Sequence, residues 1–374
     1  MARLDLLNVM PPRILTGLNR NLQLARARVV ALRESPRYGY IGGQGDRNLG
    51  DDVMFFAAQQ LLRHVRLVPY SFPAHERRLT VVGLSGRRYF EHVILGGGTF
   101  INPYGLDTTR QALSQGLPMW SLGTGVGSGG FGMSSRPELQ EWRSLLRDFQ
   151  RLGVRGPRSK AALETLGVTQ AEVLGDLALF LARERPVEPA SEPPRFGVNI
   201  TLPPASEKQS WSAETLLPPL VDAIRALEAA GFVPLFFGMH RNDLEPLRQL
   251  TSRLGRPDAP LHFPETMDDF ARLLGPCSFN VCVRLHAAVL STCVGVPPVS
   301  LGYREKCLDF MESMSLEDWH VDLSTARPGD IHERILQLSL EAPRLRAPIL
   351  SRALSYKAGL RAYVEALCPQ GRTS

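Results

Sequence analysis

The chain has 374 residues, of which 44% are hydrophobic and 21% are charged, and its formal net charge at pH 7 is +6. This composition is typical of a soluble globular protein, and a chain of this length is expected to fold as two domains. The excess of basic residues can reflect genome bias, or it can serve a phosphorylated ligand, an acidic glycan or an anionic membrane face. We expect no nucleic acid partner, because no basic run is interleaved with aromatic residues.

The sequence predicts neither a metal site nor a disulfide framework. The cysteines are odd in number, lie mostly in apolar contexts and form no C-x-x-C motif: Cys277, Cys282, Cys293, Cys307 and Cys368. This pattern is typical of reduced core residues in a cytosolic protein. No apolar stretch reaches the roughly 18 residues of a membrane span. No signal peptide is recognisable either, so we expect a cytoplasmic protein.

Residues 1–37 carry seven arginines against Asp5 and Glu34. Apolar residues recur at helical spacing from Ile14 to Val29. The pattern therefore predicts a basic helical segment. It fits a helix docked on the following domain or, alternatively, an amphipathic helix that lies on anionic lipid.

The first domain is expected to begin with a strand at Tyr38–Tyr40. A glycine-rich turn, Gly42 to Asp51, then leads into a helix that Asp51 or Asp52 can cap. Such a turn at a helix N-terminus can hold an anion. The spacing is not G-x-G-x-x-G, so a dinucleotide site is only weakly indicated, and the glycines can equally serve just to permit a tight turn.

Further short apolar runs each end in glycine or a charged residue. They are His92–Leu95 before Gly96–Thr99, Pro118–Leu122 before Gly123–Gly127, Gly153–Arg155, and Val173–Leu174 before Gly175–Asp176. Glycine loops can bring backbone close to a ligand. Several strands that all end in glycine or a charged residue predict a parallel sheet. The ligand-binding residues of such a sheet are expected to lie at one edge.

The clearest linker is Glu184–Pro194, which is rich in proline and glutamate. Beyond it, the patterns predict strands at Phe196–Thr201 and Val233–Phe237, and helices at Trp211–Ala230, Asp243–Leu254, Met267–Leu274 and Ile349–Leu367. We therefore expect a basic segment at 1–37, a domain at 38–185, a linker at 186–195, a second domain at 196–345, and a C-terminal helix at 346–374 that packs back on the first domain.

The stretch 281–306 is the strongest candidate for a functional site. A buried strand is predicted at Phe279–Val283 and a tightly packed helix at Ala287–Val294. Arg284 and His286 lie where the strand gives way to the helix. This places a guanidinium and an imidazole at the carboxyl end of a strand, where ligands bind in open α/β sheets.

Several motifs, in their order and spacing, resemble the polysaccharide pyruvyl transferase family. They are Gly45-x-x-Asn48-x-Gly50-Asp51, Gly96-Gly97-Gly98, Gly123-x-Gly125-x-Gly127, Val154-Arg155, Asp176, Arg284-Leu285-His286-Ala287, Gly295-x-Pro297 and Tyr303-x-x-Lys306. The resemblance spans roughly Tyr38 to Met314. It implies an α/β fold of two Rossmann-like domains with parallel sheets that face each other across a cleft, as in GT-B glycosyltransferases. It also implies phosphoenolpyruvate as donor, a saccharide acceptor and no cofactor.

The resemblance further implies which residues form the site. His286 and Arg284 are expected to be catalytic, with His286 as general acid toward the enol carbon or, alternatively, as general base. The residues expected to bind substrate are Arg155, Lys306, Leu285, Asn48, Asp51, Gly97, Gly98, Thr99 and Gly125. His240 and Asn242 are further candidates, not because of the resemblance but because they lie on another loop at a strand end. Arginine and lysine suit phosphoenolpyruvate, because it carries both a carboxylate and a phosphate.

Structural alternatives exist for the same side chains. Where family members often have an acidic residue after the arginine that corresponds to Arg155, this chain has Gly156, so Arg155 is a weaker candidate than Arg284. Lys306 can equally be a solvated surface residue, and Asn242 can cap a helix. We expect Asp176 to fix a loop rather than to act in catalysis.

The predicted function is pyruvyl transfer from phosphoenolpyruvate to hydroxyls of a cell-envelope or exopolysaccharide precursor, with formation of a pyruvate ketal and release of phosphate. The expected location is the cytoplasm or, alternatively, the inner membrane face as a peripheral protein, and the sequence leaves open whether the acceptor is lipid-linked. One alternative is a GT-B nucleotide-sugar glycosyltransferase, for which Glu305 is the nearby carboxylate that could bind ribose hydroxyls. The other is a family member that binds a glycan and transfers nothing.

Overall fold

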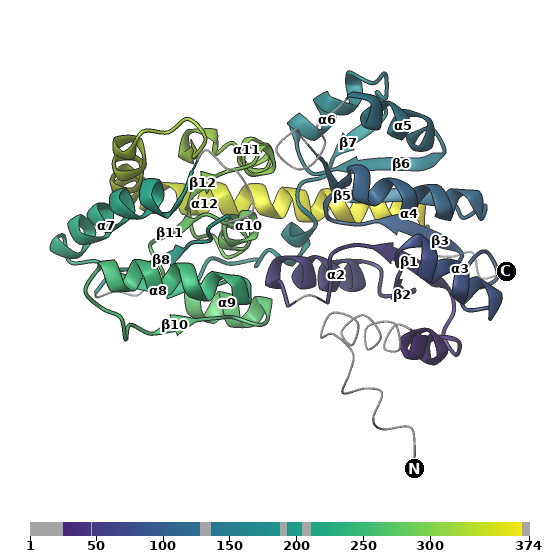
Figure 1. Cartoon of the computed structure of the whole chain (residues 1–374), viewed down its shortest axis with the longest axis horizontal. Coiled ribbons are helices and arrows are strands. Elements are labelled where there is room, and N and C mark those ends of the chain that lie inside the picture. The colour runs from purple at the N-terminus through teal and green to yellow at the C-terminus, as the bar shows by residue number, and fades with distance from the viewer. Residues whose placement is uncertain (1–24, 46, 128–135, 188–192, 204–210, 369–374) are drawn as a thin grey trace, which may run out of the picture.

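We describe a computed structural model of the chain, in residues 25–45, 47–127, 136–187, 193–203 and 211–368. The chain forms two lobes that lie side by side, each with a parallel β-sheet flanked by helices (Figure 1). The first lobe contains the N-terminal half of the described chain, and the second lobe contains the C-terminal half except for the end of the last helix.

In the described residues the first lobe has a seven-stranded sheet in the order β2-β1-β3-β5-β6-β7, with β4 paired to β5. Its strands are β1 (Arg37–Ile41), β2 (Arg66–Pro69), β3 (His92–Leu95), β4 (Gly98–Ile101), β5 (Met119–Val126), β6 (Phe149–Val154) and β7 (Ala171–Val173). Its helices are α2 (Leu49–Leu61), α3 (Pro73–Val81), α4 (Pro103–Ser114), α5 (Arg136–Leu146), α6 (Pro157–Glu164) and the 3₁₀ helix η3 (Leu177–Leu181).

The second lobe has a six-stranded parallel sheet in the described residues, in the order β10-β9-β8-β11-β12-β13. Its strands are β8 (Arg195–Asn199), β9 (Val233–Phe237), β10 (Leu261–His262), β11 (Phe279–Cys282), β12 (Pro298–Gly302) and β13 (His320–Asp322). Its helices are α7 (Ala213–Ala229), η4 (Arg241–Asp243), α8 (Leu244–Arg253), α9 (Met267–Leu274), α10 (Leu285–Cys293), α11 (Glu305–Ser313) and η5 (Glu317–Trp319). The strand order changes direction between β8 and β11, which is where doubly wound sheets bind ligands.

Alternation along the strands gives the first sheet two buried faces. Ile94 belongs to a core that continues through η3 into the second lobe. Its neighbours Val93 and Leu95 belong to a second core on the opposite face. Successive residues of a strand point to opposite faces of the sheet. When both faces are covered, every residue of the strand is buried, so the strand is apolar along its whole length. The first core joins the two lobes through apolar packing.

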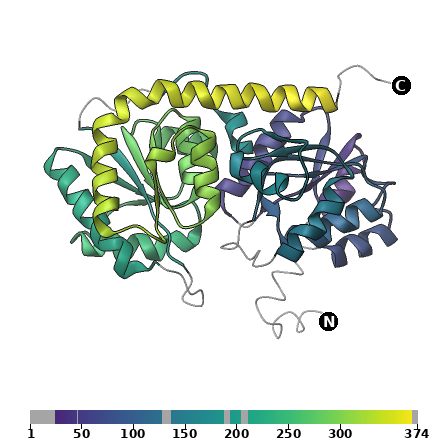
Figure 2. The ribbon, with the colours of Figure 1, turned by 90° about the horizontal axis from the view of Figure 1, so that it is seen from above.

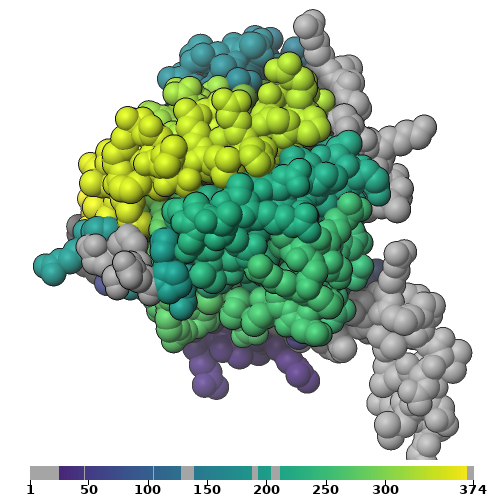
Figure 3. Space-filling view, turned by 90° about the vertical axis from the view of Figure 1, so that its left-hand side faces the viewer, coloured from purple at the N-terminus to yellow at the C-terminus, as the bar shows by residue number. Residues whose placement is uncertain are grey.

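The C-terminal helix α12 (Pro328–Leu367) runs along both lobes (Figure 2). On the outside of the second lobe it lies beside α7 (Figure 3). Its far end reaches the first sheet, where the Tyr363 hydroxyl donates to the Ser121 carbonyl oxygen at 3.0 Å. The prediction of a helix beginning only at Ile349 was wrong, because Pro343 and Pro348 lie inside one continuous helix. Each proline removes one backbone hydrogen bond, and here the packing against both lobes outweighs that loss.

Two predicted glycine loops are partly strands. Residues Gly123–Gly127 were expected to be a loop, but β5 continues to Val126. It continues because β4 supplies a neighbouring strand there, with Gly98 opposite Thr124 and Ile101 opposite Val126. For the same reason the predicted loop Gly96–Thr99 ends early, and its last two residues begin β4.

The cap of α2 also differs from the prediction. We expected Asp51 or Asp52 to cap this helix, but Asn48 is the N-cap, and its side-chain oxygen accepts from the Gly50 amide at 3.2 Å. Both aspartates instead lie in the first helical turn. There they face the positive end of the helix dipole, and their carboxylates remain available for other contacts.

No helix in the described part of the chain is both long enough and apolar enough to cross a membrane.

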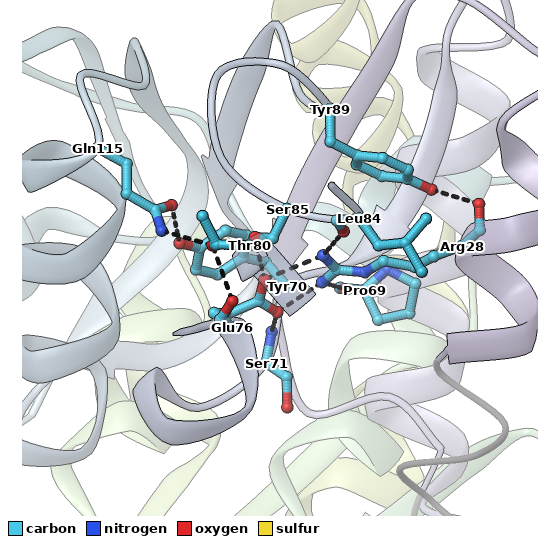
Figure 4. Close-up of polar contacts among 10 residues, drawn as sticks. All are labelled: Arg28, Pro69, Tyr70, Ser71, Glu76, Thr80, Leu84, Ser85, Tyr89 and Gln115. Atoms are coloured by element: carbon cyan, nitrogen blue, oxygen red, sulfur yellow. Dashed lines mark hydrogen bonds and ion pairs between the residues drawn. The ribbon is translucent and has the colours of Figure 1, made fainter. Parts of the chain in front are cut away.

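The described end of the basic segment, residues 25–37, docks on the first lobe. Arg28 is fully buried and donates to both carboxylate oxygens of Glu76, at 3.0 and 2.5 Å (Figure 4). Ser71 and Ser85 donate to the same carboxylate, and Arg28 also donates to two backbone carbonyl oxygens. A buried ion pair of this kind is costly to break, because either charge left alone cannot regain water. Residues 1–24 lie outside the described residues.

We expect Glu76→Gln to lower the free energy of unfolding by about 3–5 kcal/mol, because it leaves the Arg28 guanidinium buried without a charged partner. Glu141→Gln is the matched control. It removes the carboxylate of an exposed pair, 2.5 Å from Arg110, and should cost less than about 1 kcal/mol. Urea denaturation measures both. Equal losses in the two variants would show that the buried pair does not hold this segment in place.

Candidate active site

The carboxyl ends of the two sheets meet at the first turn of α2. The Leu49 amide, in the first lobe, donates to the Met239 carbonyl oxygen, in the second, at 3.0 Å. Gly50, the next residue, packs against the ring of His286 so closely that any side chain at position 50 would overlap the imidazole. A side-chain-free turn therefore lets the two lobes approach, and it places His286 at their interface.

Arg284 is held in one orientation by the second lobe. It is the N-cap of α10, and its backbone amide donates to the side-chain oxygen of Asn199, at the end of β8. Its Nε lies 2.7 Å from each carboxylate oxygen of Asp243. Asp243 in turn accepts from the amides of Met239 and His240. The guanidinium is thus pre-oriented, and its side chain keeps 20% of its surface exposed for a ligand.

His286 lies in the first turn of α10 and is 12% exposed. Its Nε2 has no hydrogen-bond partner among the residues that the structure describes, and it lies 3.7 Å from Oδ2 of Asp176. Burial lowers the pKa of His286 to about 4, although the Asp51 carboxylate opposes the shift. The imidazole is therefore neutral at neutral pH, with one nitrogen facing a carboxylate.

Arg155, immediately after β6, is fully buried. Within the described residues, none of its side-chain nitrogens has a hydrogen-bond partner, and Oδ2 of Asp309 lies 3.5 Å from Nε. Gly125 makes room for the guanidinium, because a side chain there would overlap it. Buried guanidinium groups without hydrogen bonds are unfavourable, so this one points to an anionic ligand.

Lys306 lies in the first turn of α11 and is partly buried. Burial lowers its pKa to about 8, and the positive charges of Arg155 and Arg304 act in the same direction. Because its side chain is partly buried, Lys306 is not a freely solvated surface lysine. It shares the electrostatic environment of Asp51, His286 and Arg155.

Two carboxylates complete the cluster. Burial raises the pKa of both Asp51 and Asp176. Asn48 donates to Asp51 at 2.7 Å, which fixes that carboxylate. Asp176 uses Oδ1 to cap η3, accepting from the Ala178 amide at 3.0 Å, while its Oδ2 has no hydrogen-bond partner in the described part of the chain. Asp176 thus fixes a loop, as we expected, and also faces His286.

The other predicted residues lie in varied places. The Gly97 amide donates to the Tyr40 hydroxyl at 3.2 Å in the interior. Gly98 and Thr99 are the half-buried start of β4. Leu285 is buried in the core, so its side chain packs and does not line the site. Asn242 is an exposed residue of η4, and its backbone amide donates to Nδ1 of His240 at 3.2 Å.

A groove of about 570 Å³ opens between the lobes beside this cluster. Its lining residues are Arg47, Leu49 and Asp52 from the first lobe, and Gly238, Met239, His240, Arg241, Phe263, Pro264 and Glu265 from the second. The groove borders the cluster of charged residues around His286 and Arg284 in two places. Gly50, between Leu49 and Asp52, packs on His286, and the amides of Met239 and His240 bond to the partner of Arg284.

Sequence reasoning missed two residues at this interface. Asp309 follows Lys306 by three positions, so helical spacing could have placed both on one face of α11. Phe263 follows the short strand β10, which the sequence did not predict. Among the described residues, no group of three or more histidine, cysteine, aspartate or glutamate side chains is arranged to hold a metal ion.

Solved structures with the same arrangement of lobes share little sequence with this chain. Anabaena HepE in complex with UDP and glucose has a TM-score of 0.53 at 12% identity, over 89% of this chain and 99% of HepE. The UDP-GlcNAc 2-epimerase of Neisseria meningitidis bound to UDP-GlcNAc has a TM-score of 0.51 at 12% identity, over 89% of this chain and 99% of the epimerase. The predicted fold is thereby confirmed: two Rossmann-like domains with parallel sheets in a GT-B-like arrangement.

The sequence itself matches a family model described as polysaccharide pyruvyl transferase over residues 48–305, which is more than half of its length. The matched region begins at the N-cap of α2 and ends at the first residue of α11. It therefore includes Arg155, Asp176, Arg284 and His286. The predicted resemblance is confirmed, and this chain belongs to the polysaccharide pyruvyl transferase family.

Proposed function

We propose that this transferase moves the pyruvyl group of phosphoenolpyruvate onto hydroxyls of a saccharide, forming a pyruvate ketal and releasing phosphate. One observation carries the proposal: Arg155 is buried, no described residue forms a hydrogen bond with its guanidinium, and it lies in the same cluster as Arg284, Lys306 and a neutral imidazole. The acceptor would be a cell-envelope or exopolysaccharide precursor, used in the cytoplasm or at the inner membrane face. The chemistry needs no cofactor.

The cluster suits a small donor with two anionic groups. Phosphoenolpyruvate presents a carboxylate and a phosphate from one three-carbon frame, so it needs cations from different directions. Arg155 comes from the first lobe, and Arg284 and Lys306 come from the second. Planar guanidinium groups bind either oxyanion through paired hydrogen bonds. Binding would give the Arg155 nitrogens the acceptor atoms that they lack.

The proton balance of the reaction gives His286 the role of carrying a proton from an acceptor hydroxyl to the methylene carbon. In ketal formation, two acceptor hydroxyls each form a bond to C2 of phosphoenolpyruvate, and the bond from C2 to the phosphate oxygen breaks. One hydroxyl proton must reach the methylene carbon, and the other leaves with phosphate. A neutral imidazole can accept the first proton and then deliver it to that carbon. The lowered pKa of His286 supports the base role first, with the acid role following from the proton it has gained.

The two carboxylates would support the charged state of His286 during this transfer. Asp176 lies 3.7 Å from Nε2 of the ring, and the Asp51 carboxylate raises the pKa of His286 against the effect of burial. A dianionic phosphate bound nearby would act in the same direction. The imidazolium would therefore be more stable in the complex than in the free protein.

The interdomain groove is the place that we propose for the saccharide. Phe263, at its wall, is 37% exposed, and Gly238 lets its ring lie directly over the end of β9. A flat aromatic face suits the C–H face of a sugar ring, while Asp52, Glu265 and His240 can hydrogen-bond to hydroxyls. Its volume of about 570 Å³ lies within the usual range for ligand sites.

The alternative of a nucleotide-sugar glycosyltransferase is less well supported by the geometry. Glu305, the carboxylate considered for ribose hydroxyls, is exposed and pairs with Arg158 at 3.4 Å. A transferase of that kind would release a nucleoside diphosphate, whereas pyruvyl transfer releases phosphate from phosphoenolpyruvate only when an acceptor is present. Product analysis thus separates the two functions.

We expect His286→Gln to lower kcat by about 10²–10⁴-fold, because glutamine fills similar space but cannot carry the proton. The matched control is His320→Gln. His320 also has its pKa lowered by burial to about 4, but it lies at the start of β13 and contacts Ser300. Acceptor-dependent phosphate release measures both variants. Equal loss of activity in the control would show that general destabilisation, not proton transfer, explains the result.

We expect kcat/KM for phosphoenolpyruvate to fall as the pH rises through about 8, because Lys306 loses its positive charge there. In Lys306→Arg the guanidinium stays charged, so this fall should be absent up to about pH 10. The profile is measured from about pH 5, where His286 is already neutral. The same alkaline fall in both proteins would exclude Lys306 as its origin.

We expect Phe263→Ala to raise KM for the saccharide about tenfold while leaving KM for phosphoenolpyruvate within twofold, as the loss of one aromatic contact would. Phe72→Ala is the control, because Phe72 is 63% exposed at the N-cap of α3, outside the groove. Initial rates over both substrate concentrations give the two constants. A selective rise in KM for phosphoenolpyruvate would assign the groove to the donor instead.

A further inference from the structure

One side chain crosses the lobe interface to cap a helix that has no cap of its own. Helix α6 begins with Gly156 at the N-cap and Pro157 at the first position, and no side chain of the first lobe caps it. Asp309 of α11, in the second lobe, instead accepts from the amides of Arg158 and Ser159 at 2.9 and 3.2 Å. The first free amides of α6 are thereby satisfied by a carboxylate from the other domain.

Asp309 fits this place closely. It is buried, and its second oxygen, Oδ2, accepts from the Ser159 hydroxyl at 2.7 Å. A side chain at position 156 would overlap Asp309, so glycine is what permits the approach. At the rim of the same interface, Arg158 pairs with Glu312 at 2.9 Å. That second pair crosses the lobes but does not contact Arg155.

The same carboxylate is the anion nearest to Arg155. Oδ2 of Asp309 lies 3.5 Å from Nε of Arg155, which is an ion-pair distance but gives no good hydrogen bond. On its other side the guanidinium lies over Gly125, where a side chain would overlap Nη2. Asp309 thus attracts the Nε side, and neither Nη group has a hydrogen-bond partner among the described residues.

Helix α11 delivers two charges to the first lobe at once. Lys306 and Asp309 are three positions apart, so they lie on one face of the helix. If the lobes separated, Arg155 would lose the carboxylate beside it, and the cluster would lose Lys306. The contact between α6 and α11 is therefore a condition for the arrangement of cations around the site.

We propose that Asp309 is a positioning residue, which holds Arg155 in the orientation that binds the donor and does so only when the lobes are in contact. This inference rests on the proposed function, because the donor is taken to be phosphoenolpyruvate. Asp309 does not touch the donor itself. It orients the guanidinium through charge, and the α6 amides keep its own carboxylate from turning away.

The test is a double-mutant cycle on phosphoenolpyruvate binding, measured by titration calorimetry. We expect Asp309→Asn to raise the dissociation constant about tenfold, because the amide can still accept from the α6 amides but carries no charge. In an Arg155→Met background the same substitution should have less than a twofold effect, because the group that Asp309 positions is gone. Glu312→Gln, which removes only the rim pair, should change the dissociation constant less than twofold.

A role limited to helix capping predicts a different pattern. Asp309→Asn would then weaken binding by the same factor with Arg155 or Met at position 155, and that result would overturn the positioning role while leaving the proposed function intact. Failure of the wild-type protein to bind phosphoenolpyruvate would overturn the proposed function first. Thermal unfolding of each variant is recorded alongside. If Asp309→Asn does not fold, Asp309→Ser, which retains an oxygen for the α6 amides, takes its place in the cycle.

Discussion

The site depends on a buried positive charge, the guanidinium of Arg155, with which no described residue forms a hydrogen bond. Moving a guanidinium out of water costs several kcal/mol unless protein groups replace the water. Among the described residues, Arg155 has one carboxylate within ion-pair distance, at 3.5 Å, and no hydrogen-bond partner. The surrounding structure must hold this arrangement in place. A core that is continuous between the lobes and the helix α12, which reaches both sheets, are the elements that can do so. An anion that enters the site relieves the cost, so the same feature that lowers stability favours binding.

The charges that meet at the interface come from both halves of the chain. Arg155 and Asp176 belong to the first lobe, and Arg284, His286 and Lys306 belong to the second. Parallel sheets place the residues after their strands on one edge, and the strand order brings the ends of β8 and β11 side by side. Neither lobe alone could surround a small dianion, because each contributes cations from one direction only. Because the two sheet edges face each other, cations reach the space between the lobes from both sides.

The sequence predicted those parts of the site that depend on the order of residues within one strand–helix unit. Arg284 and His286 could be placed because apolar runs and a glycine marked the strand and helix around them. The roles of Asp309 and Gly50 could not be predicted in this way, since they depend on which surface of one lobe meets the other. The prediction that the glycine-rich stretches are loops was partly wrong for a related reason. Gly123–Gly127 is largely strand because β4 lies beside it. The pattern of apolar residues within one strand does not indicate which other strand will pair with it.

The neutral state of His286 connects the architecture to the chemistry. Gly50 brings α2 against the imidazole, and this burial is what lowers its pKa to about 4. A protonated ring in the free protein would attract any anion and could not accept a proton from a hydroxyl. In the proposed reaction a neutral ring would gain its charge only as the hydroxyl attacks, when Asp176 and Asp51 are already in place to stabilise it. Because these carboxylates are fixed by α2 and η3, the stabilisation needs no rearrangement at the moment of proton transfer.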